Sequence, residues 1–109
     1  MRLHIEYLDQ NECFAAQLPC EGVVRAQLSS SDSQLPWYLV HLDVPLVHEQ
    51  VVYTHLLLAS RWEDMPVGRA EPTSVFILLV DPSHTTVADG FSSKRYLHVA
   101  WGMAHVIGA

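Results

Sequence analysis

Residues 37–44, with the sequence WYLVHLDV, alternate between two kinds of side chain. One set is apolar throughout: Tyr38, Val40, Leu42 and Val44. The other set starts with two apolar residues and then carries an imidazole and a carboxylate, at His41 and Asp43. Because successive side chains of a β-strand point to opposite faces, this pattern predicts a half-buried strand with polar groups on its second face.

Five other segments have the composition and spacing of β-strands. They cover residues 3–8, 23–29, 51–62, 73–80 and 96–107. The run at 73–80 is apolar on both faces, which is typical of a central strand. Since most connections are short, and short connections join antiparallel neighbours, we predict an all-β antiparallel meander of six or seven strands. Such a meander would form a small barrel or a strongly curved sheet.

A helix competes with a strand near residues 10–18. Asp9 followed by Glu12 fits the capping box at the start of a helix, and residues 14–18 tolerate helix. The same segment also suits the return strand of a hairpin. Both alternatives stay open at this point: the all-β prediction allows at most one short helix near residues 10–18, and the alternative fold class is α+β.

The chain has the size of one domain, so we assign residues 1–109 to a single β domain. Half of its residues are hydrophobic and only 17% are charged, against roughly 25% in typical soluble domains. With few charges to cover a small domain, part of the surface is expected to lie against another subunit. We therefore expect a homo-oligomer, a dimer or higher. The terminal strand at 96–107, apolar on both faces, is the segment expected at the contact.

The net charge of −6 is accompanied by one lysine and five arginines, which form no basic patch. Nucleic-acid binding requires clustered Lys or Arg, so neither nucleic acid nor an anionic membrane is expected as a partner. The chain also has seven histidines. If all were protonated, they would move the net charge from −6 to about +1.

Cys13 and Cys20 belong to no CxxC motif and no secretory cysteine framework. This usage predicts reduced thiols in a cytoplasmic protein. The first residues lack a basic region followed by an apolar run, so we expect no signal peptide. The longest apolar run, near 75–80, is too short to span a membrane.

Polar side chains recur on the strand faces that lie opposite the apolar ones. From this parity we predict a ligand-binding patch made of His41, Asp43, Tyr53, His55, Arg61 and His98. Its imidazoles and carboxylate would hydrogen-bond to the ligand, Arg61 would anchor an anion, and Tyr53 would form an amphipathic wall. The alternative is an ordinary solvent face of an antiparallel sheet, on which cross-strand polar pairs are normal. Residues of the same parity border the patch: His4, Glu6, Arg25, Gln27 and Tyr96.

A histidine beside a carboxylate can also act as a general base, with Asp43 orienting the imidazole of His41. The spacing His41-x-Asp43, followed by His98, has the residue types of a two-histidine, one-carboxylate metal site. The surrounding residues give no further cue, so no metal is predicted. The chain has no nucleophile elbow, no Gly-rich phosphate loop and no cofactor motif, and we expect no cofactor.

Together these features favour a small β-protein that binds a small organic ligand or a protein partner without catalysis. Two alternatives remain open. One is a small hydrolase, isomerase or lyase that uses His41 or His55 as general base. The other is an inhibitor or immunity-type protein that binds its partner through an acidic surface and the loops at 62–72 and 81–95.

Overall fold

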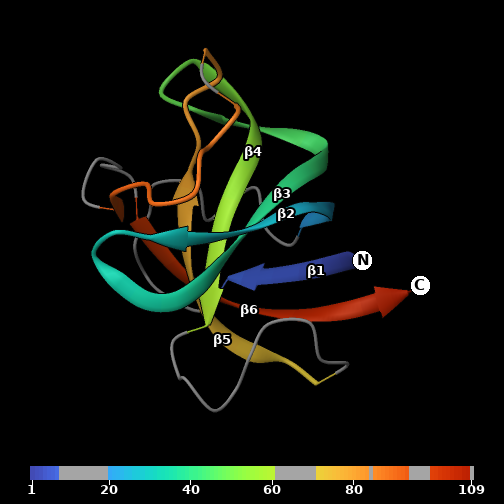
Figure 1. Ribbon diagram of the computed structural model, residues 1–109. Coiled ribbons are helices and arrows are strands. Elements are labelled where there is room, and N and C mark those ends of the chain that lie inside the picture. The colour runs from blue at the N-terminus through green and yellow to red at the C-terminus, as the bar shows by residue number, and fades with distance from the viewer. Residues whose placement is uncertain (8–19, 61–70, 84, 94–98, 109) are drawn as a thin grey trace.

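A computed structural model of the chain describes residues 1–7, 20–60, 71–83, 85–93 and 99–108. Within these residues the structure is all-β, and each strand pairs antiparallel with the next along the chain. The last strand returns to the first and closes a barrel (Figure 1). The strands are β1 (Arg2–Tyr7), β2 (Cys20–Ser30), β3 (Ser33–His48), β4 (Val51–Ser60), β5 (Thr73–Leu79) and β6 (Val99–Gly108).

The predicted antiparallel meander is thus confirmed, and of its two predicted shapes the barrel is the one adopted. The region that suits either a helix or a strand, residues 10–18, lies outside the described residues. No helix long and apolar enough to cross a bilayer occurs in the part of the chain that the structure describes.

The last strand finds both of its neighbours within its own chain. Leu3 of β1 pairs with Val106, and Thr73 of β5 pairs with Ala104. Closure therefore pairs one edge of β6 over residues 102–108 and the other edge over residues 99–104. The strand that is expected at a contact between subunits is thus already paired, over part of each edge, within its own chain.

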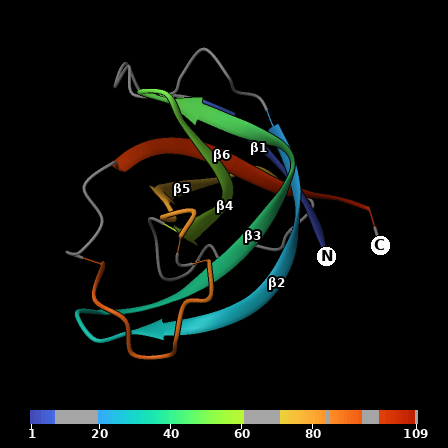
Figure 2. The ribbon, with the colours of Figure 1, turned by 90° about the horizontal axis from the view of Figure 1, so that it is seen from above.

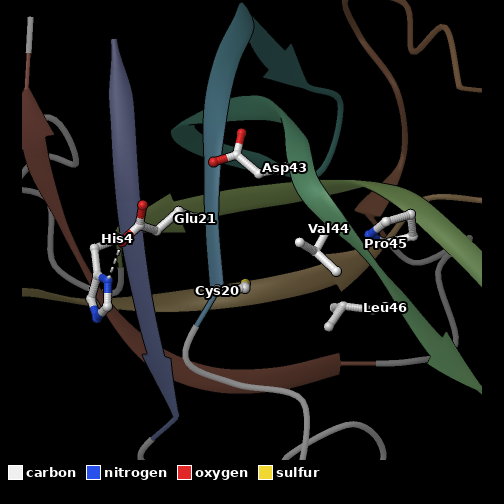
Figure 3. A pocket seen from close by; sticks show the side chains of 7 residues that line it. All are labelled: His4, Cys20, Glu21, Asp43, Val44, Pro45 and Leu46. Carbon is white, nitrogen blue, oxygen red and sulfur yellow. Dashed lines mark hydrogen bonds and ion pairs between the residues drawn. The ribbon is translucent and has the colours of Figure 1, made fainter.

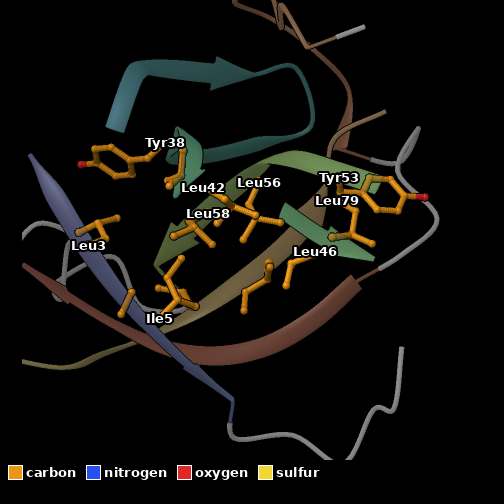
Figure 4. Packing of buried hydrophobic residues seen from close by; sticks show 13 residues of the cluster. Leu3, Ile5, Tyr38, Leu42, Leu46, Tyr53, Leu56, Leu58 and Leu79 are labelled. Carbon is orange, nitrogen blue, oxygen red and sulfur yellow. The ribbon is translucent and has the colours of Figure 1, made fainter. Parts of the chain in front are cut away.

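The barrel interior is filled by the apolar faces of the strands (Figure 4). Leu3, Ile5, Leu56 and Leu58 are completely buried. Tyr38, Val40 and Leu42 also point inward, as the alternation of residues 37–44 predicts. The remaining core members are Leu46, Tyr53, Val75, Ile77, Leu79 and Ala104, with Cys20, Val24 and Val106 packed against them.

The regular alternation of β3 ends at Leu42. Pairing with β4 passes directly from His41–His55 to Leu46–Tyr53, so four residues of β3 lie opposite one residue of β4. This wide bulge exposes Val44 to 71%, although the sequence pattern places it on the apolar face. Although a proline cannot donate to a ladder, β3 continues through Pro45 to His48. Pro45 is tolerated because it falls in the bulge, where no ladder hydrogen bond is required.

The same irregularity shifts the faces of β4. The sequence pattern puts Tyr53 on the face of His55, opposite Leu56 and Leu58. In the structure Tyr53 is 8% exposed and belongs to the interior cluster with both leucines. The outer face begins instead with Thr54 and His55, which are half-buried.

A second apolar cluster lies on the outside of the barrel. It consists of Trp37, Leu39, Leu57, Ala59, Leu78 and Val80. Residues 85–93 cross this cluster beside the β2–β3 hairpin (Figure 2), and Phe91 meets Trp37 edge to face at 5.8 Å. Asp89 accepts a hydrogen bond from the backbone amide of Ser29, and Asp32 accepts hydrogen bonds from Ser92 and Ser93. This segment therefore covers the apolar part of the outer face and leaves the polar part accessible.

Two glycines allow the strands to approach closely. A Cβ atom at Gly22 would lie 2.6 Å from the carbonyl oxygen of His41 and 2.7 Å from a methyl group of Val40. Gly102 has a similar role against the backbone of Glu6. A glycine inside a strand often marks a bulge, but the register shift between β1 and β6 falls at Arg2 and Leu3 and not at Gly102.

Candidate functional site

The polar residues of the outer face form a band across five strands. His105 of β6 lies opposite His4 of β1, which lies opposite Glu21 of β2. Further along the barrel, His41 of β3 lies opposite His55 of β4. Each of the four histidines flanks inward-pointing core residues, so strand alternation turns its ring outward.

The first histidine pair is joined by an arginine. The imidazoles of His41 and His55 are stacked, with ring centroids 4.6 Å apart and an interplanar angle of 7°. The Nη2 atom of Arg25 lies 3.4 Å from Nδ1 of His41. We call Arg25, His41 and His55 the basic cluster, because all three side chains can carry positive charge.

A bulge in β2 places Arg25 in this cluster. Val24 pairs with Val40 and Ala26 pairs with Leu39, so Arg25 is the extra residue between two consecutive pairs. An unpaired residue in a bulge can turn its side chain away from the regular direction. The bulge thus directs Arg25 toward the histidine pair.

Hydrogen bonds assign the proton of neutral His41 and engage one ring nitrogen of His55. A guanidinium can only donate, so Nδ1 of His41 must accept, and neutral His41 carries its proton on Nε2. Thr54 Oγ1 lies 2.8 Å from Nδ1 of His55, which leaves Nε2 as the nitrogen of that ring for a ligand. Burial lowers the pKa of His55, and the positive charges of His41 and Arg25 lower it further.

The second histidine pair has acidic neighbours. His4 and His105 have ring centroids 5.2 Å apart, at an angle of 45°. Nδ1 of His4 lies 3.3 Å from Glu21 Oε2, and Nε2 lies 3.3 Å from Glu6 Oε1. Carboxylates thus surround the ring of His4, whereas an arginine faces the ring of His41.

Asp43 contacts Arg2 rather than a histidine in the described residues. The guanidinium of Arg2 donates to both carboxylate oxygens of Asp43. It also lies 3.8 Å from Glu21. Arg2 therefore connects β1, β2 and β3 at the place where the β2–β3 ladder ends.

A pocket of about 560 Å³ opens at that place (Figure 3). The β2–β3 ladder runs only as far as Gly22–Leu42. Beyond this pair, β3 diverges from β2 through its bulge, and a gap forms between the two strands. The lining residues are His4, Cys20, Glu21, Asp43, Val44, Pro45 and Leu46. We call this gap the lateral pocket.

The lateral pocket has one polar and one apolar side. His4, Glu21 and Asp43 bring an imidazole and two carboxylates. Val44, Pro45 and Leu46 form an apolar wall that faces Cys20 across the pocket (Figure 3). Burial raises the pKa of the Cys20 thiol to about 12, with Asp43 and Glu21 adding to the effect. The thiol therefore stays protonated at neutral pH.

The structure brings together two of the six residues predicted for the ligand patch, His41 and His55. Asp43 lies apart from them in the lateral pocket, and Tyr53 is in the interior. Arg61 and His98 lie outside the described residues. The predicted Asp43–His41 arrangement for a general base is not what the described residues form, because Arg2 holds Asp43.

The sequence patterns did not identify the lateral pocket. Cys20 and Glu21 appear in a turn-forming sequence, and Arg2 precedes the first recognisable alternation. Only the shared parity of His4 and Glu6 points to this part of the outer face. In the described residues, no group of three or more His, Cys, Asp or Glu side chains is arranged to hold a metal ion.

Comparison of the chain with protein-family models, with curated proteins and with solved structures finds no match. The class of protein is therefore defined by its fold and its candidate site alone. The protein is a small closed antiparallel β-barrel with a lateral pocket and a band of histidines on its outer face.

Proposed function

We propose that this protein binds a small organic ligand in the lateral pocket, without catalysing a reaction on it. The observation that carries the proposal is the pocket of about 560 Å³. This volume falls within the roughly 300–1,000 Å³ of small-molecule sites. The core side chains in Figure 4 fill the barrel interior, which favours the lateral pocket over the lumen as the binding site.

The composition of the pocket also supports ligand binding. Small-molecule sites combine an apolar wall with a few polar groups that orient the ligand. Here Val44, Pro45 and Leu46 supply the wall. The carboxylates of Glu21 and Asp43 supply acceptors on the opposite side.

Two features support binding rather than catalysis. Nucleophilic attack by a cysteine requires the thiolate. The raised pKa of Cys20, about 12, leaves almost none at neutral pH. Asp43, which the sequence suggests would orient His41 as a general base, is engaged by Arg2 instead.

The test is a fragment screen followed by amide NMR, with Val44→Trp as the blocking variant. Val44 is 71% exposed, so a larger side chain there can enter the pocket without disturbing the core. The matched control is Val47→Trp, on the same strand, 50% exposed and not part of the lining. Hits should shift amides around Cys20 and Leu46 and should be lost in Val44→Trp alone. Equal binding by both variants, or no hit at all, would refute the proposal.

We also infer self-association, because the β3–β4 hairpin exposes four valines: Val44, Val47, Val51 and Val52. An apolar group of this kind on a chain with few charges favours contact between copies. Light scattering should give more than the monomer mass of 12.3 kDa. A monomer at micromolar concentration would contradict the inference. The free thiol of Cys20 agrees with the cytoplasmic location inferred from cysteine usage.

A further inference from the structure

The basic cluster places three groups that can carry positive charge side by side on the outer face. Arg25 is exposed, and the two histidine rings beside it are half-buried and stacked. The charges that act on His55 are those of His41 and Arg25, and both oppose its protonation. Like charges held together by the backbone are stabilised by an anion that sits between them.

We propose that Arg25, His41 and His55 form a binding site for the oxyanion group of a small acid, a carboxylate or a phosphate. This site is separate from the lateral pocket, since none of its three residues lines that pocket. Arg25 supplies a planar set of N–H donors suited to two oxygens at once. Nε2 of His41 supplies an N–H donor already in the neutral ring, and Nε2 of His55 supplies one when that ring is protonated.

The contact between Arg25 and His41 makes the site respond to pH. It requires His41 to accept at Nδ1, which the ring can do only when it is neutral. Protonation of His41 removes this acceptor and turns the contact into repulsion between two cations. The donors of Arg25 are then released toward an external oxyanion, which compensates the charges of both residues.

The elements around the cluster bring few compensating groups. On β2, the residue opposite His41 is Val23, which carries no charge. On β3, the nearby acid is Asp43, which Arg2 engages. On the side of β5, the amide of Val80 donates to the carbonyl of His55, and the following Asp81 accepts from Ser83. The described acids next to the cluster are therefore already engaged by other groups.

The other histidine pair provides an internal control. His4 and His105 also lie ring to ring on the outer face, but Glu6 and Glu21 contact the ring of His4. Carboxylates in these positions compensate a protonated imidazole and repel an anion. Two pairs in one molecule thus differ in the sign of their charged neighbours, and only the basic cluster is expected to attract an oxyanion.

The test is a titration with inorganic phosphate, followed through the ring-proton NMR signals of the histidines. Chloride at equal ionic strength serves as the reference, and acetate as a second probe. At about pH 5.5, below the unperturbed imidazole value, phosphate should shift the signals of His41 and His55 but not those of His4 and His105. Affinity should fall by about tenfold, equivalent to roughly 1.4 kcal/mol, at about pH 7.5. A response to phosphate alone, or to acetate as well, distinguishes the two oxyanion classes.

Variants distinguish phosphate binding at the basic cluster from a general attraction of phosphate to protonated histidines. Arg25→Gln and His55→Gln should each weaken phosphate binding by about tenfold. His105→Gln, an outer-face histidine of the other pair, should bind phosphate like the natural chain. An unchanged amide spectrum away from β2–β4 shows that each variant is folded, since Arg25 is exposed. If all four histidines shift alike, if none shifts, or if Arg25→Gln binds phosphate normally, the proposal is wrong.

Discussion

The two histidine pairs have the same residue types and the same position on the outer face, yet opposite surroundings. His41 and His55 are stacked nearly parallel beside Arg25. His4 and His105 are tilted by 45°, and the ring of His4 lies between two glutamates. The neighbours of a histidine, rather than the histidine itself, therefore decide whether its positive charge is already compensated or can attract an external anion.

This contrast arises from local backbone irregularity. The β2 bulge brings Arg25 to the first pair, because Val24 and Ala26 take the two consecutive pairings with β3. The second pair lies on regular ladder, in which His4 is directly opposite both Glu21 and His105. A regular sheet places polar residues in predictable rows, whereas a bulge adds a side chain that no alternation pattern assigns to a face.

The largest expected effect comes from disturbing the backbone that holds both pairs. Gly22 lies opposite Leu3 of β1 and Leu42 of β3. In Gly22→Ala the new Cβ would collide with the carbonyl of His41 at 2.6 Å, so we expect a loss of about 2 kcal/mol in unfolding free energy. Urea unfolding measures this loss, and the ring signals of both pairs should move with it.

Gly90→Ala is the matched control for that loss. Gly90 has a φ of 81°, but a Cβ atom there would meet nothing within 4 Å. The left-handed backbone alone should cost about 1 kcal/mol, and the ring signals of both pairs should stay in place. Equal losses in the two variants would show that close approach at Gly22 is not what limits substitution.

A second prediction concerns a variant in which the His4–His105 pair loses its acidic neighbours and so comes to resemble the His41–His55 pair. Replacing both acids that contact His4, in Glu6→Gln with Glu21→Gln, removes the carboxylates from its ring, while Asp43 stays engaged by Arg2. We expect this double variant to show phosphate-induced shifts at His4 and His105 that the natural chain lacks, with an affinity within about tenfold of the basic cluster. If phosphate does not shift the ring signals of His4 and His105 in this variant, the sign of the neighbouring charges alone does not explain the difference between the pairs.

The smallest expected effect is a pH dependence of stability. The pKa of His55 is lowered by burial and by its positive neighbours, so the unfolded chain binds this proton more readily than the folded one. The natural chain should therefore lose stability as pH falls below about 6.5, the value of a free imidazole, and keep losing it down to the lowered pKa. The loss should stay below about 1 kcal/mol, because solvent screens a partly exposed ring.

His55→Gln removes this titration. The variant should gain stability relative to the natural chain between about pH 7 and pH 5, as measured by urea unfolding at each pH. His105→Gln is the matched control, because it removes an outer-face histidine that lies outside the basic cluster. If the unfolding free energies of the natural chain and of His55→Gln changed with pH in the same way, the lowered pKa of His55 would not be the cause of the pH dependence.

Much of the fold could be predicted from the period of two. Residues 37–42 alternate as a strand, and Tyr38, Val40 and Leu42 point inward as expected. Short connections predicted the antiparallel order, which the register of every strand pair confirms. These features depend on residues that are neighbours in sequence, and alternation reports them directly.

The site was harder to predict because it depends on where ladders end. No local pattern shows that β2 and β3 separate after Gly22–Leu42, so the lateral pocket could not be anticipated. Val44 and Tyr53 each change faces at the bulge, for the same reason. Residues 85–93 appear as a polar loop in the sequence, yet they cover Trp37 and its neighbours because the barrel leaves an apolar patch outside.

Closure of the barrel also affects how the chain reaches this structure. The β1–β6 ladder joins Leu3 to Val106, near opposite ends of the sequence, and contacts so far apart are slow to form. During synthesis, β1 must wait with one edge open until Val99–Gly108 has left the ribosome. Until then the barrel is an open sheet, and its free edges are the surfaces that a chaperone would need to protect.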